Sequence, residues 1–259
     1  MLQFYKYHGA GNDFIFIYNF DNSFEDNPTH IQFLCNRRTG IGADGLILLN
    51  TPNQENIDFE MRYFNADGYE GSMCGNGGRC AIAFAKKMEL IENETIFKGI
   101  DGMHRGKIIS ENKNLMEVTL QMKNVDKIMP YRNGYYLDTG SPHVVQFVDN
   151  VETIDVVAQG KSIRHHSDFP EGTNVNFVQI KENQLFVRTF ERGVEDETLS
   201  CGTGVTASSL AYSLIHLNSE ISIKTLGGNF KVSFQKQENT FKNIYLQGPV
   251  CFVFKGVLS

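Results

Sequence analysis

The feature that most constrains this chain is an internal repeat of a short cysteine–glycine motif. Residues 74–81 are Cys-Gly-Asn-Gly-Gly-Arg-Cys-Ala, and residues 201–208 are Cys-Gly-Thr-Gly-Val-Thr-Ala-Ser. Both segments begin with Cys-Gly-x-Gly and continue into small residues, and Cys74 and Cys201 lie 127 positions apart in a chain of 259 residues. A self-similarity that spans half the chain indicates a duplicated structural unit.

Four further matches follow the same order at nearly the same offset. They pair Gly11–Ile15 with Gly140–Val144, Gly42–Asp44 with Gly172–Asn174, Ile100–Gly102 with Leu226–Gly228, and Leu120–Gln121 with Leu246–Gln247. We therefore predict two homologous halves. The first comprises residues 1–120, carries Cys74 and is joined by the last strand, at about residues 249–259. The second comprises residues 121–259 and carries Cys201.

Each half repeats the same pattern of expected elements. β-rich runs cover residues 14–18, 46–49 and 57–64 in the first half, and 144–148, 176–180 and 185–190 in the second. Helices are expected over residues 79–88 and 205–216, and their small or apolar side chains on nearly every face indicate that both are buried. The prediction is a mixed α/β (α+β) fold of two pseudo-symmetric domains, each a mostly antiparallel, barrel-like sheet around a central helix.

Composition excludes several classes of protein. With 41% hydrophobic and 21% charged residues, the chain can form a core without disulfide bonds, and an odd count of five cysteines argues against a secreted disulfide scaffold. The net charge of −6 argues against nucleic acid as the main partner. No apolar stretch is long enough to span a membrane, and the first residues lack the features of a signal peptide, so we expect a cytoplasmic protein.

The two Cys-Gly-x-Gly segments are each expected between a strand and the start of a buried helix. Amides at a helix N-terminus attract anions, so a thiol there should titrate below its usual pKa of about 8.5, and the glycines let a carboxylate approach the backbone. Two such thiols facing each other across a cleft could remove a proton from a carbon and return one to its opposite face. The simpler alternative is that both are buried structural thiols, as we expect for Cys35, Cys80 and Cys251.

Other uses of these cysteines fit the sequence less well. Zinc ligands are usually Cys-x₂₋₄-Cys pairs or nearby histidines, whereas Cys74 and Cys80 are separated by five residues. The Cys-x-x-Cys of thiol oxidoreductases is absent, and so are the glycine patterns of phosphate and dinucleotide loops. We therefore expect neither a metal nor a cofactor.

Four motifs stand out when the chain is taken as a whole, namely Tyr7–Phe14, Phe64–Gly68, Cys74–Cys80, and Glu191–Gly193 with Cys201–Gly204. Together they resemble the diaminopimelate epimerase family. The resemblance runs along nearly the whole chain. It implies cofactor-independent interconversion of LL- and meso-2,6-diaminopimelate, a step in lysine and peptidoglycan precursor synthesis, with this small molecule as the substrate. It also suggests a homodimer.

The resemblance implies a role for individual residues. Cys74 and Cys201 match the two acid/base cysteines, and His143 and Glu191 match positions that tune their pKa values. Arg192 would pair with the distal carboxylate of the substrate and Glu191 with its distal ammonium. The positions implied in substrate binding are Asn12, Gly45, Asn65, Gly75, Asn76, Ser141, Asn174, Glu191, Arg192, Gly202 and Thr203.

This chain departs from the family pattern at two of those positions. Gly45 stands where many members have Gln, and Ser141 where many have Asn, which changes the expected details of substrate recognition. Two alternatives stay open. One is a related two-cysteine racemase of another amino acid, although a cyclic monocarboxylate would leave Glu191 and Arg192 without a role. The other is a non-catalytic protein that binds a diamino diacid.

Overall fold

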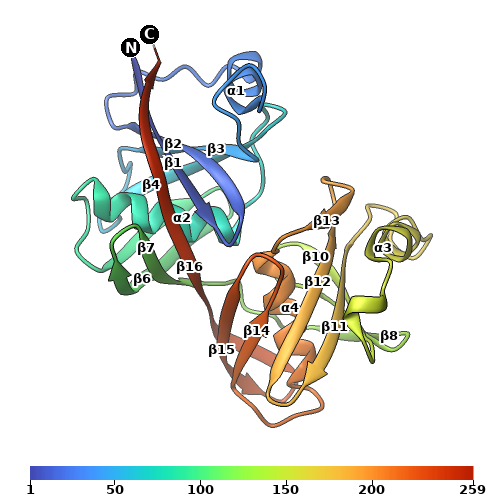
Figure 1. Cartoon of the computed structure of the whole chain (residues 1–259). Coiled ribbons are helices and arrows are strands. Elements are labelled where there is room, and N and C mark those ends of the chain that lie inside the picture. Colours follow the sequence, from blue (N-terminus) through green and yellow to red (C-terminus); the bar gives the residue numbers. More distant parts are fainter. Residues whose placement is uncertain (259) are drawn as a thin grey trace. The chain divides into compact units, whose positions relative to one another are not determined.

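The computed structural model describes residues 1–258 and divides into two compact units (Figure 1). Of the described residues, unit 1 comprises 1–120 and 248–258, and unit 2 comprises 121–247. The chain therefore passes between units at Leu120–Gln121 and at Gln247–Gly248, and these positions match each other in the sequence repeat.

Unit 1 is a closed barrel of eight strands. The strands are β1 (Leu2–Gly9), β2 (Asn12–Asn19), β3 (Gly45–Asn50), β4 (Phe59–Asn65), β5 (Glu94–Gly99), β6 (Gly102–Asn112), β7 (Leu115–Gln121) and the second part of β16 (Thr240–Leu258). β16 pairs with both β7 and β1, which closes the barrel and places Leu2 opposite Leu258 (Figure 1). The pairs β2–β3 and β4–β5 are parallel, and the other pairs are antiparallel.

Unit 2 repeats this order of strands. They are β8 (Ile128–Tyr131), β9 (Gly134–Asp138), β10 (Pro142–Phe147), β11 (Asn174–Lys181), β12 (Gln184–Glu191), β14 (Glu220–Lys224), β15 (Asn229–Gln237) and the first part of β16. The short β13 (Asp196–Thr198) pairs with β12. Val125, just before β8, bridges Phe241 of β16. The parallel pairs are β10–β11 and β12–β14, the counterparts of β2–β3 and β4–β5.

Backbone geometry at the repeat-matched glycines supports the duplication. Gly11 and Gly140 have φ values of 90° and 107°, and Gly42 and Gly172 have values of 81° and 72°. Glycine adopts this left-handed region without the steric cost that a side chain adds, so each pair makes the same turn before equivalent strands.

A buried helix lies along the inside of each sheet. α2 (Gly75–Lys87) packs against β1, β2, β3, β4 and β6, and α4 (Gly202–Tyr212) packs against β9 to β12, β14 and β15. In α2, Phe84 contacts the rings of Tyr5, Tyr7 and Phe16. The mixed α/β prediction with strands around central helices is therefore confirmed. The shorter α1 (Pro28–Cys35) packs against β3, and α3 (Val156–Arg164) packs against β11 and β12, close to the 3₁₀ turn Val151–Thr153.

Three details of the sequence prediction are wrong. Both central helices begin earlier than expected, at Gly75 and Gly202, because the cysteine itself caps the helix and the glycines form its first turn. α4 ends at Tyr212 rather than at residue 216. Cys251 is half-buried, because its apolar run belongs to a strand with one outward face, whereas Cys35 and Cys80 are buried as expected.

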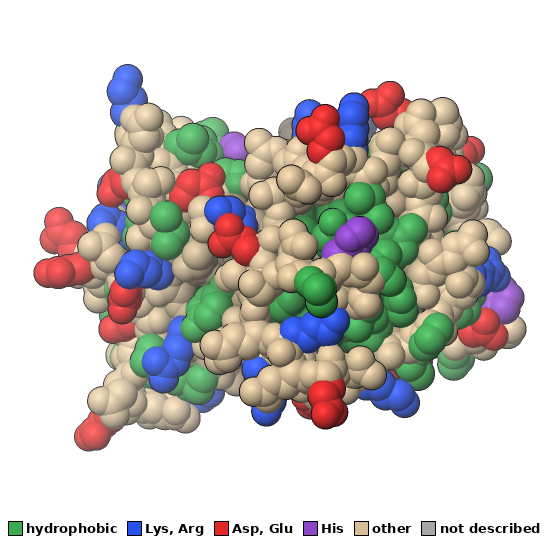
Figure 2. All heavy atoms as spheres, turned by 90° about the horizontal axis from the view of Figure 1, so that it is seen from below, with side chains coloured by type: hydrophobic (Ala, Val, Ile, Leu, Met, Phe, Trp, Pro, Cys, Tyr) green, Lys and Arg blue, Asp and Glu red, His purple; other side chains and the backbone are tan. Residues whose placement is uncertain are grey.

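The surface carries charges of both signs. On the face that Figure 2 shows, acidic and basic side chains are interspersed, so the net charge of −6 is not gathered into one block there. No helix within residues 1–258 is long and apolar enough to cross a bilayer.

Candidate active site

Cys74 caps the N-terminus of α2 in unit 1. Its backbone is extended (φ −105°), and its Sγ accepts a hydrogen bond from the Gly77 amide at 3.5 Å. The first amides of a helix have no helical carbonyl to bond, so the sulfur takes the place that Ser or Asp usually fills. The helix field and this amide both favour a negative charge on the sulfur.

Asn12, at the start of β2, connects Cys74 to the polar groups around it. The amide oxygen of Asn12 lies 3.6 Å from Cys74 Sγ and accepts from Asn76 Nδ2 at 3.3 Å, and Asn12 Nδ2 donates to Asp44 Oδ2 at 2.7 Å. Asp44 in turn binds Arg37 at 2.7 Å. Because a carboxylate can only accept, Asp44 fixes the orientation of the Asn12 amide and keeps its oxygen towards the thiol.

Two further predicted residues lie at the same end of the barrel strands as Asn12. Gly45 begins β3 and pairs with Asn65, the last residue of β4, and Gly45 is also the β-sheet partner of Phe14 on β2. Asn65 Oδ1 accepts from the Tyr63 hydroxyl at 2.9 Å. A Cβ on Gly45 would lie 2.5 Å from both Tyr63 Cε2 and the carbonyl oxygen of Phe64, so a larger side chain does not fit there without rearrangement.

Arg79 lies fully buried beneath the Cys74 segment. Its guanidinium donates to the Gly75 carbonyl at 3.1 Å and to Asn76 Oδ1 at 2.8 Å. Burial lowers the pKa of Arg79 to about 10, which still leaves the group charged at neutral pH. A cation is therefore fixed against the first turn of α2, and its bond to Asn76 Oδ1 turns Asn76 Nδ2 towards Asn12.

Cys201 caps α4 in unit 2 in the same way as Cys74 caps α2. It is extended (φ −123°), and its Sγ accepts from the Gly204 amide at 3.4 Å. The Thr203 hydroxyl lies 3.3 Å from the same sulfur, and the Thr203 carbonyl accepts from Thr139 Oγ1 at 3.0 Å. The matching caps show that the duplication preserved the environment of both thiols at the backbone level.

His143, on β10, is fully buried next to this segment. Its Nε2 lies 2.9 Å from Thr203 Oγ1, and its Nδ1 lies 3.1 Å from Asn176 Nδ2. Burial, with a smaller contribution from the charge of Arg192, lowers the pKa of His143 to about 3. The imidazole is therefore neutral at physiological pH.

The remaining predicted residues of unit 2 lie at the ends of neighbouring strands. Asn174, the sheet partner of His143, donates to Ser141 Oγ at 2.6 Å and accepts from the Arg192 amide at 2.9 Å. Glu191, the last residue of β12, accepts from Thr198 Oγ1 at 2.8 Å. The Arg192 guanidinium is half-exposed and makes a long contact, 3.5 Å, with the carbonyl of Glu171.

In each unit, then, the structure brings the predicted residues of that unit to one end of the sheet, around the first turn of the central helix. In unit 1 these are Asn12, Gly45, Asn65, Cys74, Gly75 and Asn76. In unit 2 these are Ser141, His143, Asn174, Glu191, Arg192, Cys201, Gly202 and Thr203.

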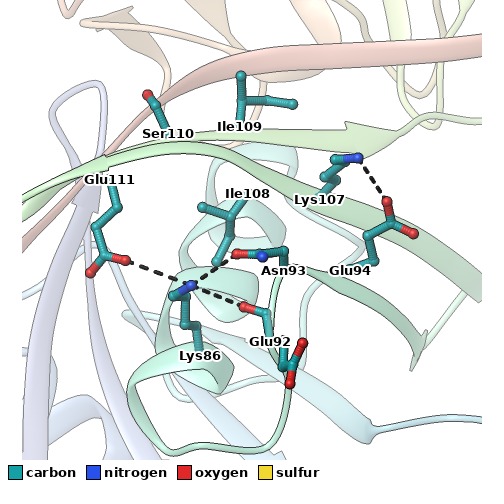
Figure 3. A pocket seen from close by; sticks show the side chains of 9 residues that line it. All are labelled: Lys86, Glu92, Asn93, Glu94, Lys107, Ile108, Ile109, Ser110 and Glu111. Atoms are coloured by element: carbon teal, nitrogen blue, oxygen red, sulfur yellow. Dashed lines mark hydrogen bonds and ion pairs between the residues drawn. The ribbon is translucent and has the colours of Figure 1, made fainter.

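A surface hollow of about 680 Å³ lies elsewhere in unit 1 (Figure 3). It is lined by Lys86 and by residues 92–94 and 107–111. Lys86 is at the C-terminal end of α2, so the hollow lies a helix length of roughly 20 Å from Cys74. The Lys86 ammonium already binds Asn93 Oδ1 at 2.9 Å and Glu111 at 3.7 Å, and this hollow has no part in the cysteine site.

Sequence reasoning missed two buried polar residues at the cysteine segments, Arg79 and Asn176. Both carried a signal. Arg79 is a charged residue within the buried part of α2, residues 75–85, and Asn176 interrupts the apolar run of β11. A polar side chain at a fully buried position needs partners, and such residues are therefore candidates for organising a site.

Comparison with solved structures defines the class of fold. The chain is similar to a phenazine biosynthesis protein of the PhzF family from Bacillus anthracis, with a TM-score of 0.77 at 15% identity, covering 100% of this chain and 99% of that one. It is also similar to a probable proline racemase from Agrobacterium radiobacter, with a TM-score of 0.71 at 14% identity, covering 100% and 93%. This is the two-domain α/β fold that those proteins share.

Sequence comparison defines the family within this class. The family model for diaminopimelate epimerase matches residues 4–127 and 135–253. A diaminopimelate epimerase from Flavobacterium psychrophilum is 49% identical, covering 98% of this chain and 99% of that protein, and one from Chlorobaculum tepidum is 40% identical, covering 97% and 99%. The chain belongs to the diaminopimelate epimerase family.

Proposed function

We propose that this chain is a cofactor-independent epimerase that interconverts LL- and meso-2,6-diaminopimelate by proton transfer at Cα, with Cys74 and Cys201 as the two acid/base groups. The observation that carries the proposal is the equal placement of the two thiols. Each is the N-cap of a buried helix and accepts from the amide three residues further on, at 3.5 Å and 3.4 Å. Family membership supplies the substrate.

The proposed reaction balances without a cofactor. One thiolate takes the proton of the Cα–H bond and becomes a thiol, and the electron pair of that bond stays on carbon. The other thiol gives its proton to the opposite face of the carbon and becomes a thiolate. The two sulfurs therefore exchange protonation states in each turnover, and the reverse reaction begins from the opposite state.

The carbanion formed midway needs stabilisation, because the Cα–H of an amino acid is a very weak acid. Amides in the first turn of a helix are oriented before the reaction, and such preorganised donors are worth several kcal/mol when charge develops on a carboxylate. We assign this role to the segments Gly75–Asn76 and Gly202–Thr203. We assign Arg192 to the distal carboxylate, Glu191 to the distal ammonium, and Asn12, Gly45, Asn65, Ser141 and Asn174 to further substrate contacts.

The test is exchange in deuterium oxide. Reduced protein is incubated with LL-diaminopimelate, and formation of the meso isomer and deuterium at Cα are followed by chromatography and mass spectrometry. We expect both in the wild type, and loss of epimerisation in Cys74→Ala and in Cys201→Ala. Cys35→Ala and Cys251→Ala are matched controls that should keep activity. Absence of exchange and epimerisation in folded, reduced wild type would overturn the proposal.

Substrate choice is tested in the same samples. L-proline in place of diaminopimelate should show no deuterium incorporation, and racemisation of proline without epimerisation of diaminopimelate would favour the alternative racemase. We further propose a cytoplasmic homodimer with a role in lysine and peptidoglycan precursor synthesis. Sedimentation equilibrium of the purified chain should give about twice the monomer mass of 29.3 kDa, and the monomer mass alone would contradict the dimer.

A further inference from the structure

Asn176 is a buried polar residue at a position where the other half of the chain has an apolar one. Its side chain is fully buried on β11, and its counterpart on β3 is Ile47. The sheet partner of Ile47 is Phe16, and that of Asn176 is Val145. Ile47 and Asn176 are 129 positions apart in the sequence, and so are their partners Phe16 and Val145. A Cβ on Gly77 would lie 3.0 Å from Ile47 Cδ1, and one on Gly204 would lie 2.4 Å from Asn176 Oδ1. Both side chains thus occupy the space beneath the first turn of the central helix.

The hydrogen bonds of Asn176 have only one consistent orientation. Its Nδ2 lies 3.0 Å from the Val144 carbonyl, which can only accept, so the atom at that position must be the donor nitrogen. The amide oxygen then accepts from Thr189 Oγ1 at 2.9 Å. The second hydrogen of Nδ2 is directed at His143 Nδ1, 3.1 Å away. His143 Nδ1 must therefore be the unprotonated nitrogen of the ring.

This fixes the direction of the remaining bonds as far as Cys201. A neutral imidazole with Nδ1 unprotonated carries its hydrogen on Nε2, which donates to Thr203 Oγ1 at 2.9 Å. The Thr203 oxygen accepts there, so its own hydrogen is free to point to Cys201 Sγ at 3.3 Å. Arg192, the residue that follows β12, is the charged group that acts on the ring. Its positive charge helps to keep the imidazole neutral.

We propose that Asn176 is a positioning residue for Cys201: it sets the tautomer of His143, so that the Thr203 hydroxyl donates its hydrogen to the sulfur. We call Asn176, His143 and Thr203 the hydroxyl relay. The relay stabilises the thiolate of Cys201, because hydrogen bonds to a charged acceptor are stronger than neutral ones. His143 therefore acts as a donor and not as a base. The inference rests on the proposed function only in giving the thiolate a catalytic use.

The tautomer of His143 is read from the wild-type protein, and a substitution in the relay serves only to assign the signals. In protein labelled with ¹⁵N-histidine, the nitrogen shifts of His143 are assigned by their loss in His143→Gln. We expect a protonated Nε2 and an unprotonated Nδ1 from pH 5 to 8. A protonated Nδ1 would overturn the proposal directly, whatever the variants do.

The effect on Cys201 is tested by a double-mutant cycle. In protein labelled with ¹³C at the cysteine Cβ, the shift of Cys201 reports its thiol–thiolate midpoint and is assigned by its loss in Cys201→Ser. Thr203→Val should raise the midpoint by about one pH unit, the size expected for one hydrogen bond to a charged group. Asn176→Leu, nearly isosteric, should raise it by a similar amount, and the double variant should show no further rise.

The matched control is Thr206→Val, which removes a buried hydroxyl from the same helix. Thr206 Oγ1 donates to the Gly202 carbonyl at 2.9 Å and is not part of the relay, so the Cys201 midpoint should not move. Additive shifts in the double variant, or an unchanged midpoint in folded Thr203→Val, would refute the relay. Deuterium exchange by the wild type is measured on the same preparation. Its persistence alongside a failed relay overturns this inference alone, and its absence overturns the proposed function.

Discussion

Replacing Arg79, the buried cation of unit 1, should lower the reactivity of Cys74 while changing the stability of the fold less. Arg79→Met keeps an unbranched side chain of similar length in the fully buried site but removes the charge and the bonds to the Gly75 carbonyl and Asn76 Oδ1. A thiolate at Cys74 raises the pKa of Arg79, and because that interaction is mutual, the guanidinium stabilises the thiolate. Loss of the charge should therefore make Cys74 harder to deprotonate.

The magnitude follows from the geometry of the helix. Cys74 and Arg79 are five residues apart, and we take the corresponding rise of about 8 Å along the axis as the order of magnitude of the separation between their charges. Two unit charges at that distance interact by about 2 kcal/mol at an effective dielectric constant of about 20, which corresponds to roughly one pKa unit or slightly more. Alkylation of Cys74 at pH 7 should then be about tenfold slower in Arg79→Met than in the wild type.

The free energy of unfolding should change less than the loss of a fully buried charge alone would imply. Burial lowers the pKa of Arg79 from 12.5 to about 10, so holding the charge in the core costs about 3 kcal/mol. Two hydrogen bonds from a charged donor return about 1.5–3 kcal/mol each. Met removes both the cost and the gain, so the free energy of unfolding should fall by about 3 kcal/mol at most.

The assay is the rate of iodoacetamide alkylation at Cys74 from pH 6 to 10, resolved by peptide mass spectrometry, with urea unfolding on the same samples. Arg79→Lys is the control. It keeps the positive charge, so the pH midpoint of Cys74 alkylation should stay close to that of the wild type. An unchanged Cys74 midpoint in folded Arg79→Met would refute the electrostatic reasoning. A parallel shift in Arg79→Lys would show that the shape of the guanidinium matters rather than its charge.

Three further predictions concern stability and are checked by urea unfolding. Burial alone would raise the pKa of Asp13, but bonds from Arg37 and Lys6 outweigh it and hold that pKa well below its usual range. Asp13→Asn should therefore lower the free energy of unfolding by about 2–4 kcal/mol at pH 7. The difference between the wild type and this variant should shrink below pH 4, and a difference that stays constant with pH would contradict the prediction. His143 is protonated near pH 6.5 in the unfolded chain and only near pH 3 in the folded chain. The wild type should therefore lose up to about 1.4 kcal/mol of unfolding free energy per pH unit below pH 6.5 from this group. His143→Gln should remove that slope. Gly45→Ala should cost about 1–3 kcal/mol, because its Cβ would lie 2.5 Å from the Phe64 carbonyl oxygen; full stability would show that β3 and β4 can separate there.

The repeat made the general fold predictable from the sequence, because two copies of one unit must bury the same faces. The small residues after Cys74 and Cys201 predicted two buried helices, and the structure has them as α2 and α4. Their starting residues were not predictable from apolar periodicity, since glycine in the first turn is a poor helix former and cysteine is not among the usual N-cap residues. The outward face of Cys251 was hidden for a similar reason: a continuous apolar run does not show which side of a strand faces the core.

The residues of the candidate site were predictable only where they belong to a sequence motif. Asn176 and Arg79 depend on partners distant in sequence or on burial, as Asn176 does on Val144 and Thr189. A polar residue in an apolar run can be noticed in the sequence, but the direction of its hydrogen bonds depends on its neighbours in the fold. An amide can face either way until an atom that only accepts or only donates fixes it.

The two halves differ in how they stabilise a thiolate, although the backbone around each thiol is the same. In unit 1 a full charge, Arg79, lies against the capped turn, and the counterpart of His143 is Phe14. In unit 2 the position of Arg79 is taken by Thr206, and neutral groups, His143 and Thr203, support the sulfur. The proposed reaction needs one thiol and one thiolate at the start of every turnover. Two identical environments would give both sulfurs the same midpoint, and at most pH values much of the protein would then carry two thiols or two thiolates. Different side chains around the same backbone cap would give each sulfur its own midpoint, and this would widen the pH range in which one is protonated and the other is not.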